Sequence, residues 1–378
     1  MRILQVVANV SPDGAYGGPL RVAVNQSKEL IGRGHEVRLV AGASGFDRAL
    51  PSEVEGVPAR LFRAGPVLPG GGFGSFYAPS MQSWLRKNAA GFDVAHIHFA
   101  RDFVVPLAAH AVRKARVPYV LQCHGMISPK TSPAFRLFDV AFVNRSLHDA
   151  RAIFYLTPRE KNDLLAMRTP SALLRPLVNG VPLAIPEALR AVEPSDTVEV
   201  LYLSRLHPRK RPELFAAAAQ ELVDVLKGKA RFSIVGPDGG SRSKIESILY
   251  ADPAPDSLTL EGAIPPADTL ARILQCDVFV LPSIDEPFPM AVLEAMSLGK
   301  PVIVTSSCGL APLIEEFQAG IVIDEHERSL VPAIKNLIED PALRKRMGER
   351  ARLAVRRHFS MEAIGDALVS SYTESTSE

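Results

Sequence analysis

The chain has 378 residues, 47% of them hydrophobic, and a formal net charge of +2. This length favours two domains, and the apolar content is ample for two cores. The three cysteines, Cys123, Cys276 and Cys308, are far apart and show no CxxC spacing. They argue against a disulfide framework or a zinc site and predict reduced thiols in a cytoplasmic protein. No apolar run approaches the roughly 18 residues of a membrane span, and we expect neither a span nor a signal peptide.

The charge is unevenly distributed along the chain. Residues 1–180 hold 22 Lys and Arg against 12 Asp and Glu, and the remainder holds 21 against 29. A basic first half predicts contact with something anionic, which could be a membrane surface, a lipid-diphosphate acceptor or a phosphorylated sugar. Solvated arginines without a partner are the alternative. Nucleic acid is not expected as a partner, because aromatic and basic residues do not interleave as stacking platforms.

Strands and helices alternate in two successive runs, the pattern of parallel sheets with crossover helices. The first run is predicted as strand 2–8, helix 18–32, strand 35–41, strand 93–98, helix 103–115 and strand 117–123, with shorter elements to about 175. The second has strands near 198–204, 230–236, 257–262, 277–283, 301–306 and 320–324, separated by helices. The Gly/Pro-rich residues 64–74 predict a mobile loop and residues 179–196 a linker. Ser360 is the expected N-cap of a last helix.

The strongest functional pattern runs from Glu286 to Thr305. Glu286 follows a buried strand, in the loop where open α/β sheets bind ligands. An apolar helix, Met290 to Leu298, begins just after it and carries Glu294. The free N–H groups and the dipole of that helix can receive a diphosphate. Either carboxylate can accept hydrogen bonds from sugar hydroxyls, whereas the alternative is a pair of ordinary structural glutamates.

This order of strand, Glu286, Pro-Phe-Pro, Glu294-Ala-Met, Gly-Lys-Pro and strand resembles family four of the retaining glycosyltransferases. The resemblance implies an α/β fold called GT-B, with two facing Rossmann-like, doubly wound parallel-sheet domains and a central cleft. It implies an acceptor-side domain at 1–180, to which a C-terminal helix at 360–378 crosses back, and a donor-binding domain at 181–359. Two departures stand out: Glu-Pro-Phe-Pro replaces Glu-Gly-Phe-Gly, and Cys308 replaces the first glycine of a T-x-x-G-G loop.

Other motifs of the family follow other predicted strands. Gly17, Gly18 and Arg21 match its G-G-x-x-R pattern, which faces the donor phosphates, although a plain tight turn would also explain the glycines. Arg205 and Lys210 match its R-L-x-x-x-K pattern, whose two cations hold the diphosphate in place of a divalent metal. No metal or other cofactor is therefore expected. The resemblance also implies donor contacts for Gly236, Gly262, Ala263, Ile264, Phe288, Met290 and Ala291, and for Glu294 on the ribose.

Three of the six histidines in the first half of the chain are candidate site residues, because they lie near the end of a predicted strand or just after one. His124 ends a predicted strand, and the resemblance implies that it contacts the transferred sugar, which makes it a candidate catalytic residue beside Arg205, Lys210 and Glu286. His96 and His98 share one face of a strand at i and i+2. We expect buried, hydrogen-bonded histidines or lining of the acceptor site rather than a metal pair, because no third ligand accompanies them.

The combined prediction is a retaining, metal-independent glycosyltransferase that moves a sugar from a nucleoside-diphosphate sugar to an acceptor hydroxyl. The expected acceptor is a sugar, glycan or lipid-linked molecule of polysaccharide or lipid-linked oligosaccharide assembly, with peripheral contact at an anionic inner membrane face as a linked hypothesis. A sugar-nucleotide epimerase or a glycoside phosphorylase on the same scaffold, and a non-catalytic nucleotide-sugar-binding subunit, are the alternatives. A dinucleotide dehydrogenase is not expected, because G-x-G-x-x-G follows neither predicted first strand.

Overall fold

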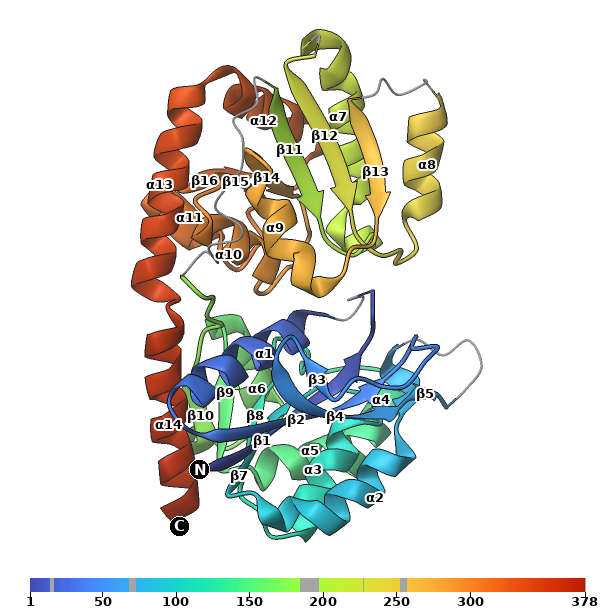
Figure 1. The fold of residues 1–378 in the computed structure, drawn as a ribbon, viewed down its shortest axis with the longest axis vertical. Helices are drawn as coiled ribbons and strands as arrows, with labels where there is room; N and C mark the ends of the chain where they lie inside the picture. Colours follow the sequence, from blue (N-terminus) through green and yellow to red (C-terminus); the bar gives the residue numbers. More distant parts are fainter. Residues whose placement is uncertain (14–16, 68–72, 184–196, 227, 252–256, 378) are drawn as a thin grey trace. The chain divides into compact units, whose positions relative to one another are not determined.

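In the computed structural model the described residues are 1–13, 17–67, 73–183, 197–226, 228–251 and 257–377. The chain divides into two compact units, each built around a sheet (Figure 1). The first unit contains most of the chain up to Gly180 and the last helix from Met361 onward, and the second contains Val181–Ser360. None of the described helices combines the length and the apolar composition that crossing a bilayer requires.

The first unit has an eight-stranded sheet in the order β10-β9-β8-β7-β1-β2-β4-β3. Only β3 pairs antiparallel, with β4, and the other neighbours are parallel. Its strands are β1 (Arg2–Val10), β2 (Glu36–Ala43), β3 (Glu53–Val54), β4 (Val57–Arg63), β7 (Val94–His98), β8 (Tyr119–Gln122), β9 (Ala152–Tyr155) and β10 (Leu174–Pro176). The strand order reverses between β1 and β7, and such a switch point is where open α/β sheets bind ligands, at the carboxyl ends of the strands.

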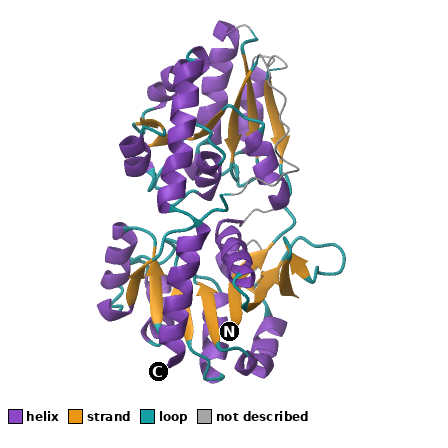
Figure 2. Ribbon diagram, turned by 60° about the vertical axis from the view of Figure 1, so that its left-hand side comes forward, coloured by secondary structure: helices purple, strands orange, loops and turns teal. Residues whose placement is uncertain are grey.

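Helices cover both faces of this sheet (Figure 2). They are α1 (Gly17–Gly32), α2 (Pro79–Asn88), α3 (Val105–Lys114), α4 (Pro133–Phe138), a π-helix at Asp139–Val143, α5 (Asn144–His148), α6 (Pro158–Ala166) and α14 (Met361–Ser377). The apolar residues of α2, α3 and α5 form one core with the sheet, and those of α1 and α14 pack on the other face. The last helix therefore supplies part of the first unit's core.

The second unit has a six-stranded, wholly parallel sheet in the order β13-β12-β11-β14-β15-β16. Its strands are β11 (Val198–Leu203), β12 (Ala230–Val235), β13 (Leu258–Gly262), β14 (Val278–Leu281), β15 (Val302–Thr305) and β16 (Gly320–Ile323). Its helices are α7 (Pro212–Leu226), α8 (Arg242–Ala251), α9 (Thr269–Leu274), α10 (Met290–Ser297), α11 (Ala311–Phe317), α12 (Leu330–Glu339) and α13 (Pro341–His358). Here the order reverses between β11 and β14, which marks a second switch point.

Each strand and helix that the sequence predicted by range is present in the structure, with small shifts at the ends. The predicted mobile loop at 64–74 and the predicted linker at 179–196 lie partly outside the described residues. Two short strands beside this predicted loop were not expected: β5 (Gly65–Pro66) and β6 (Phe76–Tyr77) form an antiparallel ribbon. The sheet of the second unit agrees almost strand for strand with the prediction, because most of its strands are rich in buried apolar residues.

Candidate active site

The predicted donor residues of the second unit gather at one edge of its sheet. Parallel strands end together, so the segments that follow them meet there. Arg205 and Lys210 follow β11, and Gly236 follows β12. Gly262, Ala263 and Ile264 lie at and after the end of β13, and Glu286, Phe288, Met290, Ala291 and Glu294 follow β14.

Lys210 and Glu286 form an ion pair at this edge. Lys210 Nζ donates to Glu286 Oε2, and Arg209 Nη2 lies 3.7 Å from the same oxygen. The side chains of Lys210 and Glu286 are only 16% and 10% exposed. Burial lowers the pKa of Lys210, and the neighbouring Glu286 carboxylate opposes that shift. The structure thus joins the cation predicted for the diphosphate to the carboxylate predicted for the sugar.

Tyr202 supports the loop that carries the two predicted cations. Its ring is completely buried, and its hydroxyl lies 3.5 Å from the carbonyl oxygens of both Arg205 and Lys210. The backbone N–H of Ile284 donates to the carbonyl of Arg209 at 2.9 Å, which ties this loop to the one after β14. Sequence reasoning missed Tyr202, because an aromatic residue inside a strand reads as ordinary core.

Two glycines are required by close backbone approach. A Cβ on Gly236 would lie 1.9 Å from the carbonyl oxygen of Ser204, and a Cβ on Gly309 would lie 1.8 Å from that of Pro287. Gly309 N–H also donates to the carbonyl of Glu286 at 2.8 Å. The second glycine of the loop after β15 is therefore the one that this packing needs. Cys308, which replaces the first, is buried, and burial raises the pKa of its thiol to about 12.

The helix α10 begins at the same edge with an uncapped first turn. No side chain caps it at Pro289, so its first N–H groups depend on other acceptors. Glu294 lies in the second turn and is 4% exposed. Phe288, just before the helix, packs edge-on against Phe359 with ring centroids 5.7 Å apart.

In the first unit, Gly17 and Gly18 open α1 at the carboxyl end of β1, as the motif predicted. Arg21 is in its first turns, and its Nη1 donates to Glu55 Oε2 at 2.7 Å. Both side chains are largely buried, at 13% and 14% exposed. Glu55 lies between β3 and β4, which sequence reasoning did not find, so nothing in the sequence pointed to this pair. The contact of Arg21 with donor phosphates stays a prediction.

His124 follows β8 in a tight left-handed turn, with φ of 52° for His124 and 71° for Gly125. Glu160, which is 3% exposed, accepts hydrogen bonds from Gly125 N–H at 2.6 Å and from Leu156 N–H at 2.7 Å. Burial raises the pKa of Glu160. Sequence reasoning missed Glu160, although the spacing of Thr157 and Glu160 is that of a capping box at the start of a helix.

His96 and His98 are buried and hydrogen-bonded, as one of the sequence-based expectations held. His96 Nδ1 lies 2.6 Å from the Tyr372 hydroxyl of α14, and His98 Nδ1 lies 2.8 Å from His124 Nε2. Within the described ranges, no three His, Cys, Asp or Glu side chains are grouped as a metal site.

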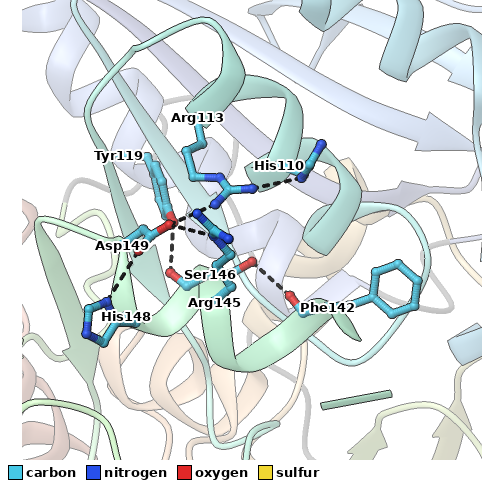
Figure 3. Close-up of polar contacts among 8 residues, drawn as sticks. All are labelled: His110, Arg113, Tyr119, Phe142, Arg145, Ser146, His148 and Asp149. Atoms are coloured by element: carbon cyan, nitrogen blue, oxygen red, sulfur yellow. Dashed lines mark hydrogen bonds and ion pairs between the residues drawn. The ribbon is translucent and has the colours of Figure 1, made fainter. Parts of the chain in front are cut away.

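A second polar cluster lies at the opposite, amino-terminal edge of the same sheet (Figure 3). Arg113 and Arg145 contact Asp149 at 2.9 and 3.3 Å. Burial alone would raise the pKa of Asp149, but hydrogen bonds from Arg113, His148 and Arg145 outweigh it and lower that pKa. The Tyr119 hydroxyl donates to the Ser146 carbonyl at 2.9 Å.

An open cavity of about 540 Å³ adjoins this second cluster. It is lined by Asn144, Arg145, Leu147, His148, Asp149, Met167, Arg168 and Thr169. Because ligands of open α/β sheets bind at the carboxyl ends of the strands, this edge does not fit a donor site. We assign the cluster in Figure 3 to stabilising α3 and α5 against the sheet.

Two doubly wound sheets, each with a switch point, and a cationic carboxyl edge beside a helix N-terminus define the class of nucleotide-sugar glycosyltransferases with the GT-B fold. Residues 16–185 match the family described as Glycosyltransferase Family 4, and residues 187–354 match Glycosyl transferases group 1. The chain belongs to family four of the retaining glycosyltransferases. The recognition made from the sequence is thereby confirmed.

Relatives and solved structures agree with this family over nearly the whole chain. A D-inositol 3-phosphate glycosyltransferase of Thermobifida fusca (strain YX) is 26% identical over 99% of this chain and 93% of its own. An alpha-D-kanosaminyltransferase of Streptomyces kanamyceticus is 30% identical over 46% of this chain and 45% of its own. The Anabaena protein Alr3699/HepE, solved with UDP and glucose, superposes with a TM-score of 0.77 at 20% identity, covering 99% of both chains.

Proposed function

We propose that this protein transfers a hexose from a UDP-sugar to a hydroxyl of a sugar, glycan or lipid-linked acceptor, with retention of configuration and without a metal ion. The observation that carries the proposal is the buried Lys210–Glu286 pair beside Arg205 at the carboxyl edge of the second sheet. Burial of two opposite charges is costly unless a ligand completes their hydrogen bonding. UDP is the proposed carrier, because the Anabaena protein is also solved with UDP-glucose.

Each residue has a role set by its charge. Arg205 and Lys210, with the N–H groups at the start of α10, stabilise the departing diphosphate, and each preorganised donor contributes about 3 kcal/mol to lowering the barrier. Glu286 accepts from hydroxyls of the transferred sugar and Glu294 from those of the ribose. His124 also contacts the transferred sugar. The acceptor oxygen attacks the anomeric carbon on the face from which the diphosphate leaves, and a phosphate oxygen takes the acceptor proton.

Peripheral contact with an anionic membrane is the second part of the proposal. It is supported by an apolar surface that we call the α4 patch: Phe135, Leu137 and Val140, which are 47%, 72% and 68% exposed. Arg136 lies between Phe135 and Leu137 in the sequence, Lys130 lies five residues before Phe135, and both are exposed. Asp139, the acidic residue within the segment, is buried and paired with Arg101 at 2.7 Å. Exposed apolar side chains with exposed cations in the same segment match the chemistry of an anionic lipid surface.

The α4 patch and His124 belong to the same connection between β8 and β9. A surface that rests on lipid headgroups would therefore bring a lipid-linked acceptor toward the histidine that we propose for the sugar. An inositol phosphate acceptor, as in the name of the Thermobifida relative, would instead be attracted by the excess of Lys and Arg in the first unit. Its transfer would not need a membrane. The two acceptor classes are separated by whether activity depends on vesicles.

The test of the donor is thermal unfolding with UDP, GDP, ADP, CMP and dTDP, with and without magnesium. A ligand at 100 times its dissociation constant adds about 2.7 kcal/mol to the free energy of unfolding. We expect UDP to raise the unfolding midpoint most, and magnesium to change nothing. If no diphosphate shifts the midpoint, the donor proposal is wrong.

Product analysis separates transfer from the alternatives. Incubation of a UDP-hexose with an acceptor should release UDP and a glycoside of unchanged anomeric configuration. Release of sugar phosphate that depends on inorganic phosphate would indicate a phosphorylase, and conversion of the UDP-sugar without acceptor would indicate an epimerase. Binding of UDP with no turnover on any acceptor would favour the non-catalytic subunit.

A further inference from the structure

Three histidine rings lie in a row in the first unit, and those of His98 and His124 meet edge to edge. The rings of His96 and His98 are parallel within 2°, with centroids 4.8 Å apart, and those of His98 and His124 are parallel within 8° at 5.0 Å. The strand β7 places His96 and His98 on one face at i and i+2, and β8, its neighbour in the sheet, leads directly into His124. His98 is 1% exposed, so its ring nitrogens must find partners inside the protein.

Those partners determine where the protons lie. Oε1 of Gln5, on β1, is 3.0 Å from Nε2 of His98. An amide oxygen only accepts hydrogen bonds, so Nε2 of His98 carries its proton. In a neutral imidazole the other nitrogen is then an acceptor, and Nδ1 of His98 faces Nε2 of His124 at 2.8 Å. His124 must therefore be the donor in this bond.

The rings are neutral, which this assignment requires. A protonated His98 would carry hydrogens on both nitrogens and would turn its Nδ1–H toward the donor of His124. Burial lowers the pKa of His98 well below its usual value and that of His124 to about 3, so both are uncharged near neutral pH. Within the described part of the chain, His98 is the single hydrogen-bond partner of the His124 side chain.

We infer that His98, held by Gln5, is a positioning residue that keeps His124 protonated on Nε2, so that His124 offers its unprotonated Nδ1 to the substrate. His124 then recognises a group that donates a hydrogen bond, which on a sugar is a hydroxyl and not a ring oxygen or a phosphate. This inference rests on the proposed function for its substrate, but the position of the proton does not. In proteins generally, the hydrogen bond made by one ring nitrogen of a histidine determines whether the other nitrogen carries a proton.

Two substitutions of His98 separate hydrogen bonding from packing. His98→Phe keeps a flat ring and removes the acceptor, whereas His98→Asn places an amide oxygen near the position of Nδ1. Nitrogen-15 NMR of the full chain distinguishes the two histidine tautomers. We expect the Nε2-protonated form of His124 in the wild type and in His98→Asn, and loss of that preference in His98→Phe.

The catalytic readout should follow the tautomer. We expect His98→Phe to lower kcat about tenfold, the effect of one hydrogen bond, with the KM for the donor nearly unchanged, and His98→Asn to restore most of kcat. Gln5→Met removes the acceptor that orients His98 and should give the same shift, which covers the case that His98→Phe does not fold. Lys335→Met, at an exposed pair with Glu339 in the second unit, is the control and should leave the His124 tautomer unchanged.

Two results would overturn the inference. One is an Nδ1-protonated His124 in the wild type, and the other is an unchanged tautomer of His124 in both His98→Phe and Gln5→Met. If the protein proves to have no transferase activity but the NMR result is as expected, the proposed function fails and the positioning role of His98 stands.

Discussion

Lys210 and Glu286, 76 residues apart in the chain, share one hydrogen-bonded ion pair at the end of the second sheet. Neither group has to be desolvated again when a donor arrives, because both are already removed from most of the solvent. The proposed diphosphate on one side and the proposed sugar on the other would therefore meet a preorganised pair.

Substitutions of this pair should have different effects. Lys210→Met keeps the aliphatic stem but removes the cation, and we expect UDP affinity to fall about 10- to 100-fold, the range for a hydrogen bond to a charged group. Glu286→Gln removes a charge that competes for Lys210, so UDP should bind at least as tightly while kcat falls. Titration calorimetry with UDP checks both. Lys335→Met, at an exposed pair with Glu339, is the control, and equal loss of affinity in the first two variants would contradict the division of roles.

Gly309→Ala should displace the loop that holds Glu286. The new Cβ would lie 1.8 Å from the Pro287 carbonyl oxygen, so the backbone must move. We expect a loss of at least about 2 kcal/mol in the free energy of unfolding and a loss of activity. Urea unfolding measures the first, and Gly32→Ala, where no atom lies within 4 Å of the added Cβ, should be harmless. A stable and active Gly309→Ala variant would show that the loop position is not needed.

Glu160→Ala should weaken the turn that presents His124. It leaves the backbone N–H groups of Gly125 and Leu156 without their acceptor, at a cost of about 3 kcal/mol for the two. We expect a lower unfolding midpoint together with a lower kcat, and Glu160→Gln, which retains one oxygen, should lose less of both. Equal behaviour of Glu160→Ala and wild type in a thermal melt coupled to an activity assay would exclude this role.

Acid should destabilise the first unit, because His96, His98 and His124 are buried in it as neutral rings. The unfolded chain protonates histidine near pH 6.5, whereas burial keeps His96 and His124 neutral in the native state down to about pH 3. The unfolded state therefore binds more protons below pH 6.5, and stability falls as the pH falls. Asp102 opposes this, because burial raises its pKa to about 7 and its native form takes up a proton where the unfolded form does not.

With His98 included, three histidines outweigh one aspartate, and we expect a net loss of roughly 2 kcal/mol between pH 6.5 and 5.5. Urea unfolding at a series of pH values measures it. Asp102→Asn keeps an oxygen for the Val104 and Val105 N–H groups that Asp102 accepts from and should steepen the dependence. A stability that is flat from pH 7 to 5 would mean that the rings are charged in the native protein or paired differently.

Vesicle binding tests the α4 patch. Sedimentation with phosphatidylserine vesicles should carry the protein down at low salt and release it at high salt. The double variant Leu137→Ser, Val140→Ser should weaken vesicle binding at every salt concentration, because it removes apolar contacts. Arg136→Glu should weaken it at low salt only, because it removes a charge. Val225→Ser removes an apolar side chain that is 56% exposed on α7 and should have no effect. Equal binding to neutral and to anionic vesicles would contradict the proposal.

Local pattern explains how much of the fold could be predicted. Most strands of the two sheets were found because they are rich in buried apolar residues. Residues 42–92 were not resolved into elements: β3, β5 and β6 have two residues each and show no periodicity, and β4 and α2 were missed with them. The helix α4 was missed because the exposed Phe135 and Leu137 blur the apolar stripe of an amphipathic helix, and α5 was missed because it has only 5 residues.

The candidate site divides in the same way. Arg205, Lys210, Glu286 and Glu294 could be placed because each follows a recognisable strand by a few residues. The bonds of the candidate residues in the first unit could not be predicted, because Arg21 bonds to Glu55 and His98 bonds to His124, which lie in separate segments of the sequence. The need for Gly309 was visible only once the carbonyl of Pro287 was seen against it.

The helix α14 has a consequence for how the protein is made. Ile364, Leu368 and Tyr372 are buried in the same core as Ile3 and Phe154, although a whole second unit is translated between them. On the ribosome, the part of this face that α14 covers stays exposed until α14 emerges. We therefore expect the nascent first unit to bind chaperones. A stop codon before α14 would leave apolar surface exposed, and the shortened protein should aggregate.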